Sequence, residues 1–201
     1  LSAPSMAMLG GIVALAVAAT FVEAYPVTIK EISSGGVSLT AVFIVGAAVI
    51  YGWEPAVIIG FVARASIELV QRRPAIRLAY NSSVYALGGG AAGAAAAVIG
   101  HDGVGGLFVE VILAAAAFYA INIPLTAGII SRWSREPFMP LLERSIYWTV
   151  VPFSIMASVS LMLAVLWERS PFLATALVGP LVAIALYQRS VHSALKAMRL
   201  A

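Results

Sequence analysis

The sequence predicts an all-α, polytopic membrane protein with about seven transmembrane helices. Hydrophobic residues make up 62% of the 201 residues and charged residues only 10%, whereas soluble domains average about 45–50% and about 25%. Mean hydropathy is +0.99. The apolar residues also form runs close to the roughly 20 residues that a helix needs to cross the hydrocarbon core of a bilayer.

Seven apolar runs follow one another along the chain, separated by short polar connections. The third run is short for a span, so six spans are the alternative count. The sixth is long enough to include a cytoplasmic extension around Glu143 and Arg144. The runs are Met6–Val22, Val37–Trp53, Pro55–Val70, Ile76–Ile99, Val104–Ile130, Phe138–Trp167 and Phe172–Tyr187.

Basic residues collect in alternate connections between these runs. Cytoplasmic loops carry an excess of lysine and arginine, so the pattern places the N-terminus outside and the C-terminus in the cytoplasm. The polar segment 23–36, EAYPVTIKEISSGG, is expected to be a cytoplasmic loop or a short interfacial piece. The basic connections hold Lys30; Arg72, Arg73 and Arg77; and Arg132 and Arg135.

Two ionisable residues lie inside the third apolar run. Arg64 and Glu68 are four residues apart, a spacing that puts both on one face of a helix. Charges at membrane depth usually face the bundle interior and mark either a structural pair or a functional site. Both interpretations stay open, and this pair is the first candidate for a ligand-binding site.

Other polar residues in the spans extend this candidate site. Asn81 and Tyr85 share a face of the fourth predicted helix, and Tyr119 and Asn122 form a stripe on the fifth. They act either as hydrogen-bonding contacts between helices or as the lining of a polar cavity shared with Arg64 and Glu68. Glu110, near the external end of the fifth helix, is a further candidate that faces an outer vestibule or pairs with Arg169.

The residue inventory argues against catalysis and against bound metals or cofactors. The chain has no cysteine and two histidines, both outside the apolar runs, so a thiolate metal site and a bis-histidine haem are excluded. Its two lysines, Lys30 and Lys196, lie at the membrane edge, which rules out a retinal Schiff base in the last helix. The net charge of +3 is too small to indicate nucleic-acid binding.

The C-terminal residues have the pattern of a signalling helix. Residues 1–189 form the predicted membrane bundle, and residues 190–201 are expected to begin a cytoplasmic helix that leads to a domain beyond this chain. Its apolar positions follow a 3-4-3 spacing suited to a parallel helix pair, which predicts a homodimer. These positions are Val191, Ala194, Met198 and Ala201.

A resemblance to a known class of proteins adds to this interpretation. The stretch GGVSLTAVFIVGAAVIYGWEPAVIIGFVARASIELVQRRPAIRLAYNSSVYAL, followed much later by LYQRSVHSALKAMRLA, resembles the multi-helix membrane regions that precede GGDEF-type diguanylate cyclase or HD-type phosphohydrolase domains in bacterial signalling proteins. The likeness covers most of residues 30–201. Two features depart from the resemblance. The cyclase signature itself is absent, and Trp53 and Glu54 occupy the middle of the G-x-x-P turn formed by Gly52–Pro55.

The resemblance implies a sensory input domain in the bacterial cytoplasmic membrane. It would sense the state of the membrane, or bind a small hydrophobic or amphipathic ligand, and relay this signal through the C-terminal helix to an output domain such as a diguanylate cyclase. On this hypothesis Arg64→Ala changes signalling more than Gly46→Ala does. The alternative is a substrate-binding membrane subunit of a vitamin-type transporter, which is also a compact six- or seven-helix protein.

Overall fold

The computed structural model describes a bundle of α-helices. The described residues are 5–24, 27–28, 36–37, 39–99 and 103–170, followed by 172–174, 177, 179, 180, 183 and 187. Within them the helices are α1 (Met6–Glu23), α2 (Thr40–Tyr51), α3 (Trp53–Val70), α4 (Ala75–Ile99), α5 (Gly103–Ser134) and α6 (Phe138–Arg169). Two antiparallel strands of two residues each, β1 (Val27–Thr28) and β2 (Gly36–Val37), lie between α1 and α2.

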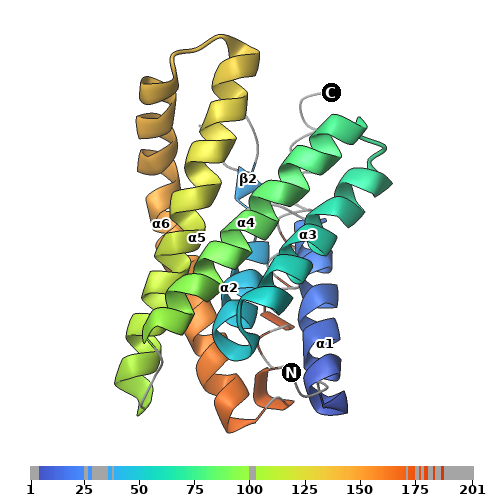
Figure 1. Cartoon of the computed structure of the whole chain (residues 1–201), viewed down its shortest axis with the longest axis vertical. Coiled ribbons are helices and arrows are strands. Elements are labelled where there is room, and N and C mark those ends of the chain that lie inside the picture. The colour runs from blue at the N-terminus through green and yellow to red at the C-terminus, as the bar shows by residue number, and fades with distance from the viewer. Residues whose placement is uncertain are drawn as a thin grey trace.

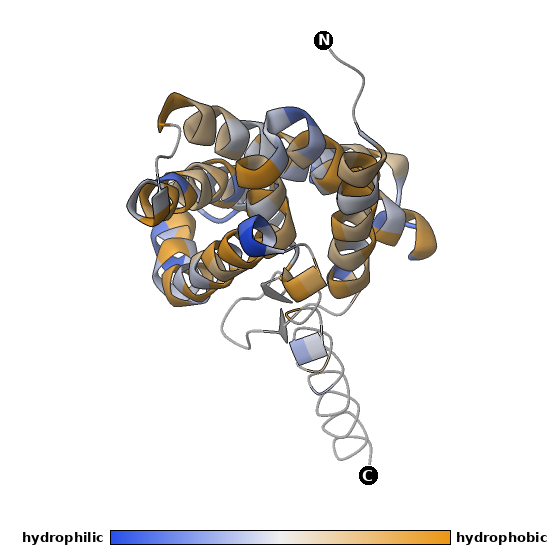
Figure 2. Cartoon of the chain, turned by 90° about the horizontal axis from the view of Figure 1, so that it is seen from below, coloured by the Kyte–Doolittle hydropathy of each residue, from blue (hydrophilic) through white to orange (hydrophobic). Residues whose placement is uncertain are grey.

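Within the described residues, four helices are long and apolar enough to cross a membrane, namely α1, α4, α5 and α6. Large hydrophobic side chains such as Val13 on α1, Phe108 on α5 and Val151 on α6 are exposed on the outside of the bundle. In Figure 2, which looks along the bundle, hydrophobic residues accordingly colour the outward as well as the inward faces of the helices. A soluble protein rarely exposes so much apolar surface, and the all-α membrane class predicted from the sequence agrees with this arrangement.

Helix α2 is the centre of the bundle. It contacts all five of the other described helices, and Figure 1 shows it enclosed by them. Every residue from Thr40 to Ala48 is buried, which explains why its sequence is apolar on all sides. At 12 residues it is shorter than the apolar run Val37–Trp53 and shorter than a full span.

A single glycine reverses the chain between α2 and α3. Gly52 has a φ of +91°, a conformation that side chains with a Cβ rarely adopt. Pro55 is the third residue of α3, where its missing N–H costs no helical hydrogen bond. The chain therefore turns within one residue, and α2 and α3 pack together as a helical hairpin.

Glycines let α3 and α4 approach each other closely. A Cβ on Gly93 would lie 2.3 Å from Cα of Trp53, and one on Gly89 would lie 2.7 Å from the carbonyl oxygen of Ala56. On the α3 side, a Cβ on Gly60 would lie 2.8 Å from the carbonyl oxygen of Tyr85. Small residues at membrane-helix interfaces allow backbones to touch in this way.

The two arginine-rich turns lie at the same end of the bundle. The turn between α3 and α4 and the turn between α5 and α6 are both at the top of Figure 1. Alternate connections therefore share one end, as the positive-inside argument requires. Each turn contains an arginine with positive φ, Arg72 at 52° and Arg135 at 59°.

The α3–α4 packing can be tested with one added methyl group. We expect Gly93→Ala to destabilise the protein by about 1–3 kcal/mol, because the new Cβ meets backbone atoms of Trp53 that cannot rotate away. The measurement is the melting temperature of the purified protein in detergent.

Gly10→Ala is the matched control, since a Cβ on Gly10 meets no heavy atom within 4 Å. Its melting temperature should stay the same or rise slightly, because alanine favours helix more than glycine does. Equal melting temperatures for the two variants would contradict the close packing of α3 and α4.

Candidate functional site

Arg64 binds two carboxylates from different helices. It lies six residues before the end of α3, about 9 Å by helical rise. Its Nη2 is 2.8 Å from Oε1 of Glu68 one turn further along, and its Nη1 donates to Oε1 of Glu23 at the end of α1. The side chains of Glu23 and Glu68 are 0% and 5% exposed, so both charges lie inside the protein.

Thr40 brings α2 into the same cluster. Its Oγ1 lies 2.7 Å from Oε2 of Glu23 and 3.1 Å from the carbonyl oxygen of Ala19. Thr40 is the first residue of α2, and a helix N-terminus carries partial positive charge. The carboxylate of Glu23 is therefore stabilised by a hydroxyl, by a guanidinium and by the favourable end of a helix.

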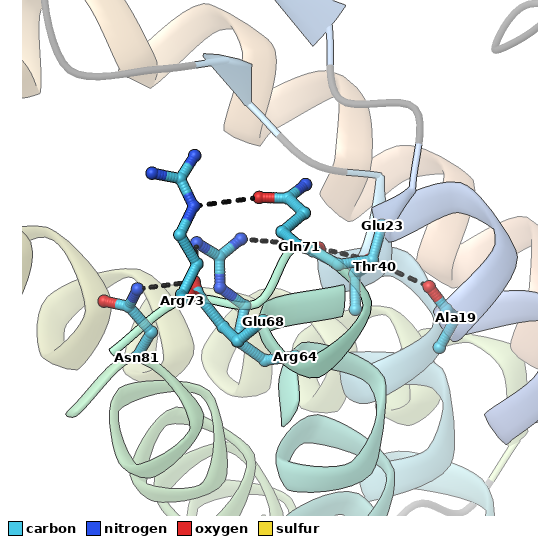
Figure 3. Close-up of polar contacts among 8 residues, drawn as sticks. All are labelled: Ala19, Glu23, Thr40, Arg64, Glu68, Gln71, Arg73 and Asn81. Carbon is cyan, nitrogen blue, oxygen red and sulfur yellow. Dashed lines mark hydrogen bonds and ion pairs between the residues drawn. The ribbon is translucent and has the colours of Figure 1, made fainter. Parts of the chain in front are cut away.

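Helix α4 completes the cluster from the other side. Nδ2 of Asn81 donates to Oε1 of Glu68 at 2.7 Å, and the guanidinium carbon of Arg64 lies 5.6 Å from the centre of the Tyr85 ring. A cation at this distance from an aromatic face is attracted to it. Figure 3 shows how Glu23, Thr40, Arg64, Glu68 and Asn81 converge from α1, α2, α3 and α4.

Some buried polar atoms in the cluster lack a hydrogen-bond partner among the described residues. Within the described part of the chain, Nε of Arg64 and Oε2 of Glu68 are buried without a hydrogen-bond partner, as is Oγ of Ser82 beside Asn81 on α4. Buried polar atoms without partners cost stability. Each such group in a native structure therefore needs an explanation, and a role besides holding the fold together is one of them.

The structure thus brings together four of the candidate residues, namely Arg64, Glu68, Asn81 and Tyr85. The mutual ion pair expected for Arg64 and Glu68 is present. Whether these residues also hold a ligand stays a prediction.

Tyr119 lies elsewhere, although the sequence stripe grouped it with Asn122. Its hydroxyl is 2.9 Å from Oγ1 of Thr149 and 3.2 Å from the carbonyl oxygen of Ile146, both on α6. The preceding Phe118 is buried against Gly88 of α4. Since consecutive helical residues are rotated by about 100°, this packing turns Tyr119 toward α6 and away from Arg64.

Within the described part of the chain, no hydrogen bond joins Asn122 to the cluster, and Glu110 lies further away. Asn122 is half-buried on α5, and Glu110 is buried in the second turn of that helix. Helix α5 begins at the end of α4 that is opposite the α3–α4 turn. Glu110 is therefore at the far end of the bundle from Arg64.

An apolar groove of about 380 Å³ lies between α5 and α6. Tyr119 borders it, and the hydroxyls of Ser154 and Ser158 in its wall donate to carbonyls of their own helix. Serine hydroxyls inside helices commonly bond the carbonyl four residues earlier in this way. With its hydroxyls already bonded, the groove is a surface for apolar contacts.

Sequence reasoning missed Glu23 and Thr40. Glu23 was assigned to a cytoplasmic loop, but the structure places it in the last turn of α1 as a buried partner of Arg64. Its only sequence signal is a single acid directly after an apolar run. Thr40 has no such signal. The predicted signalling helix, with Val191, Ala194, Met198 and Ala201, lies outside the described residues.

Comparisons with known proteins do not assign the chain to a family. No protein-family model, curated protein or solved structure matches this chain. The function is therefore argued from the chain's own residues.

The energetic role of Arg64 can be tested by removing its charge. Arg64→Met leaves Glu23 and Glu68 buried without their cation, and breaking a buried ion pair in this way typically costs about 3–5 kcal/mol. We expect a loss of that size in the free energy of unfolding measured in detergent. Adding Glu23→Gln and Glu68→Gln to Arg64→Met should restore part of it, because the uncompensated charges are then gone.

Arg144→Met is the control. Arg144 pairs with Glu136 at 3.0 Å, but both side chains are about half exposed, and exposed pairs contribute at most about 1 kcal/mol. Equal losses for Arg64→Met and Arg144→Met would show that the Arg64 cluster is not buried as described.

Proposed function

We propose that the chain is the membrane-embedded sensory input domain of a bacterial signalling protein. On this proposal its seven apolar runs lie in the cytoplasmic membrane, with the N-terminus outside, and the protein works as a homodimer. It senses the state of the membrane or binds a small amphipathic ligand. It relays this signal through its C-terminal helix to a cytoplasmic output domain of the diguanylate cyclase or HD-type phosphohydrolase class.

The observation that carries the proposal is the Arg64 cluster. Its members come from α1, α2, α3 and α4, and it contains two buried polar atoms that have no partner among the described residues. A cluster serving only as a structural lock would gain stability by satisfying those atoms or by being replaced with apolar residues. Intramembrane ionisable residues are by default candidates for functional sites.

The cluster is also suited to shifting between two arrangements. Arg64 already divides its ion pairs between Glu23 on α1 and Glu68 on its own helix. A signal that weakens one of these pairs strengthens the other, because the same guanidinium serves both. Such a shift changes how tightly α1 is held to α3, and a rearrangement of this kind is what a signalling helix would transmit.

The short path from the cluster to the basic turn supports the same proposal. Glu68 is two residues from the end of α3, and its carbonyl oxygen accepts a hydrogen bond of 3.0 Å from the N–H of Arg73. A displacement of Glu68 therefore acts directly on the turn that leads into α4.

The proposal predicts that Glu23→Gln changes output without removing the fold. The substitution preserves shape but removes the charge that binds α1 to Arg64. We expect the basal rate of cyclic diguanylate synthesis or hydrolysis by the intact protein in membranes to change at least threefold, in either direction.

Arg144→Gln is the matched control, since it removes one charge from an exposed pair. Gly46→Ala is not suitable, because its Cβ would lie 2.6 Å from Cδ2 of Leu163. Unchanged output for Glu23→Gln at equal protein levels would contradict the proposal. So would a coding sequence without an output domain after Ala201, an outcome that would favour the transporter subunit instead.

A further inference from the structure

Arg77 and Trp133 join two helices at the surface of the bundle. The guanidinium carbon of Arg77 lies 4.6 Å from the centre of the Trp133 ring. Arg77 is the third residue of α4, and Trp133 is the penultimate residue of α5. Trp133 is 79% exposed, so this contact lies on the outside of the protein.

The guanidinium of Arg77 lies over the Trp133 ring and keeps its N–H groups available for an oxygen acceptor. Among the described residues, no carboxylate or carbonyl accepts a hydrogen bond from its side chain. The nearest acid in sequence to Trp133, Glu136, is bound by Arg144 at 3.0 Å. A cation–π contact gives these N–H groups no oxygen acceptor, and the planar fork of a guanidinium matches two oxygens of a phosphate.

The surroundings of this pair are strongly basic. Segments 71–77 (QRRPAIR) and 131–137 (SRWSREP) together contain five arginines and one glutamate. Figure 1 places the turns that contain these segments at one end of the bundle. Arg72, Arg73 and Arg132 are all exposed there. An anion approaching Arg77 therefore enters a region of positive charge.

The position of the Arg77–Trp133 contact relative to the membrane indicates which kind of anion Arg77 would meet. Helices α4 and α5 are long and apolar enough to span a bilayer, so the start of one and the end of the other lie at the level of the lipid headgroups. Exposed tryptophan prefers that level. Basic clusters next to membrane spans attract anionic lipids.

We propose that Arg77, held in place by Trp133, binds the phosphate of an anionic phospholipid headgroup, with Arg72, Arg73 and Arg132 adding attraction from neighbouring positions. The bound lipid bridges the start of α4 and the end of α5. This inference goes beyond positive-inside topology, which needs the charges but assigns no contact to any of them. It is also independent of the sensory function proposed above.

The test is a titration of the purified intact protein, in a neutral detergent, with short-chain phosphatidylglycerol and with phosphatidylcholine of the same chain length. Binding is measured from the shift in melting temperature. We expect phosphatidylglycerol to bind more tightly, and Arg77→Gln to weaken its binding at least tenfold. Trp133→Leu should also weaken it, because the guanidinium is then no longer held. This variant keeps the test decisive if Arg77→Gln proves unstable.

Arg135→Gln removes the same charge from an exposed side chain at the same end of the bundle, leaves the Arg144–Glu136 pair intact and is the matched control. Loss of one diffuse charge near a membrane surface weakens binding about fivefold or less. Equal weakening by Arg77→Gln and Arg135→Gln would overturn the proposal, as would equal binding of the two lipids. Competition by inorganic phosphate at the concentration of the lipid would also overturn it, because the site would then take free anions and not a headgroup.

Discussion

The bundle depends on one guanidinium that binds two buried carboxylates. Arg64 joins Glu23 on α1 to Glu68 on its own helix, and Asn81 and Thr40 extend these contacts to α4 and α2. In an apolar surrounding each of these charges is costly alone and stable only with its partners. The cluster therefore fixes how the C-terminal ends of α1 and α3 meet the N-terminal ends of α2 and α4. Apolar packing cannot supply this orientation, because α2 is uniformly hydrophobic after Thr40.

Close backbone packing makes that cluster geometrically feasible. Gly60 lies against the backbone of Tyr85, and Gly89 lies against that of Ala56. Without side chains at these positions, α3 and α4 come near enough for Asn81 to reach Glu68 and for Tyr85 to lie beneath Arg64. The small residues and the charged residues thus have linked roles. The glycines set the distance between the helices, and the ions set their register.

The part of the site that follows from helical periodicity was predictable. The four-residue spacing of Arg64 and Glu68 implied their ion pair, and the same spacing placed Asn81 and Tyr85 on one face of α4.

Glu23 was not predictable in this way, because its contact with Arg64 spans 41 residues and depends on where α1 ends. Tyr119 forms a hydrogen bond between helices, which is one of its two predicted roles, but its partner helix was not predictable. The direction in which α5 turns that side chain is set by Phe118 packing on Gly88, and one helix's pattern does not contain this information. The first six predicted runs correspond to α1–α6, and much of the seventh, Phe172–Tyr187, lies outside the described residues. Helix α2 ends after 12 residues because Gly52 reverses the chain.

The most direct test of this account is the coupling energy between Glu23 and Arg64. A double-mutant cycle would compare the unfolding free energies of the wild type, Glu23→Gln, Arg64→Met and the double variant in detergent. Residues in one ionic network typically show coupling of about 0.5–3 kcal/mol, and the buried position of this pair leads us to expect at least about 1 kcal/mol. Additive losses, with a coupling within about 0.3 kcal/mol of zero, would show that the two side chains do not interact and would contradict the central role assigned to Arg64.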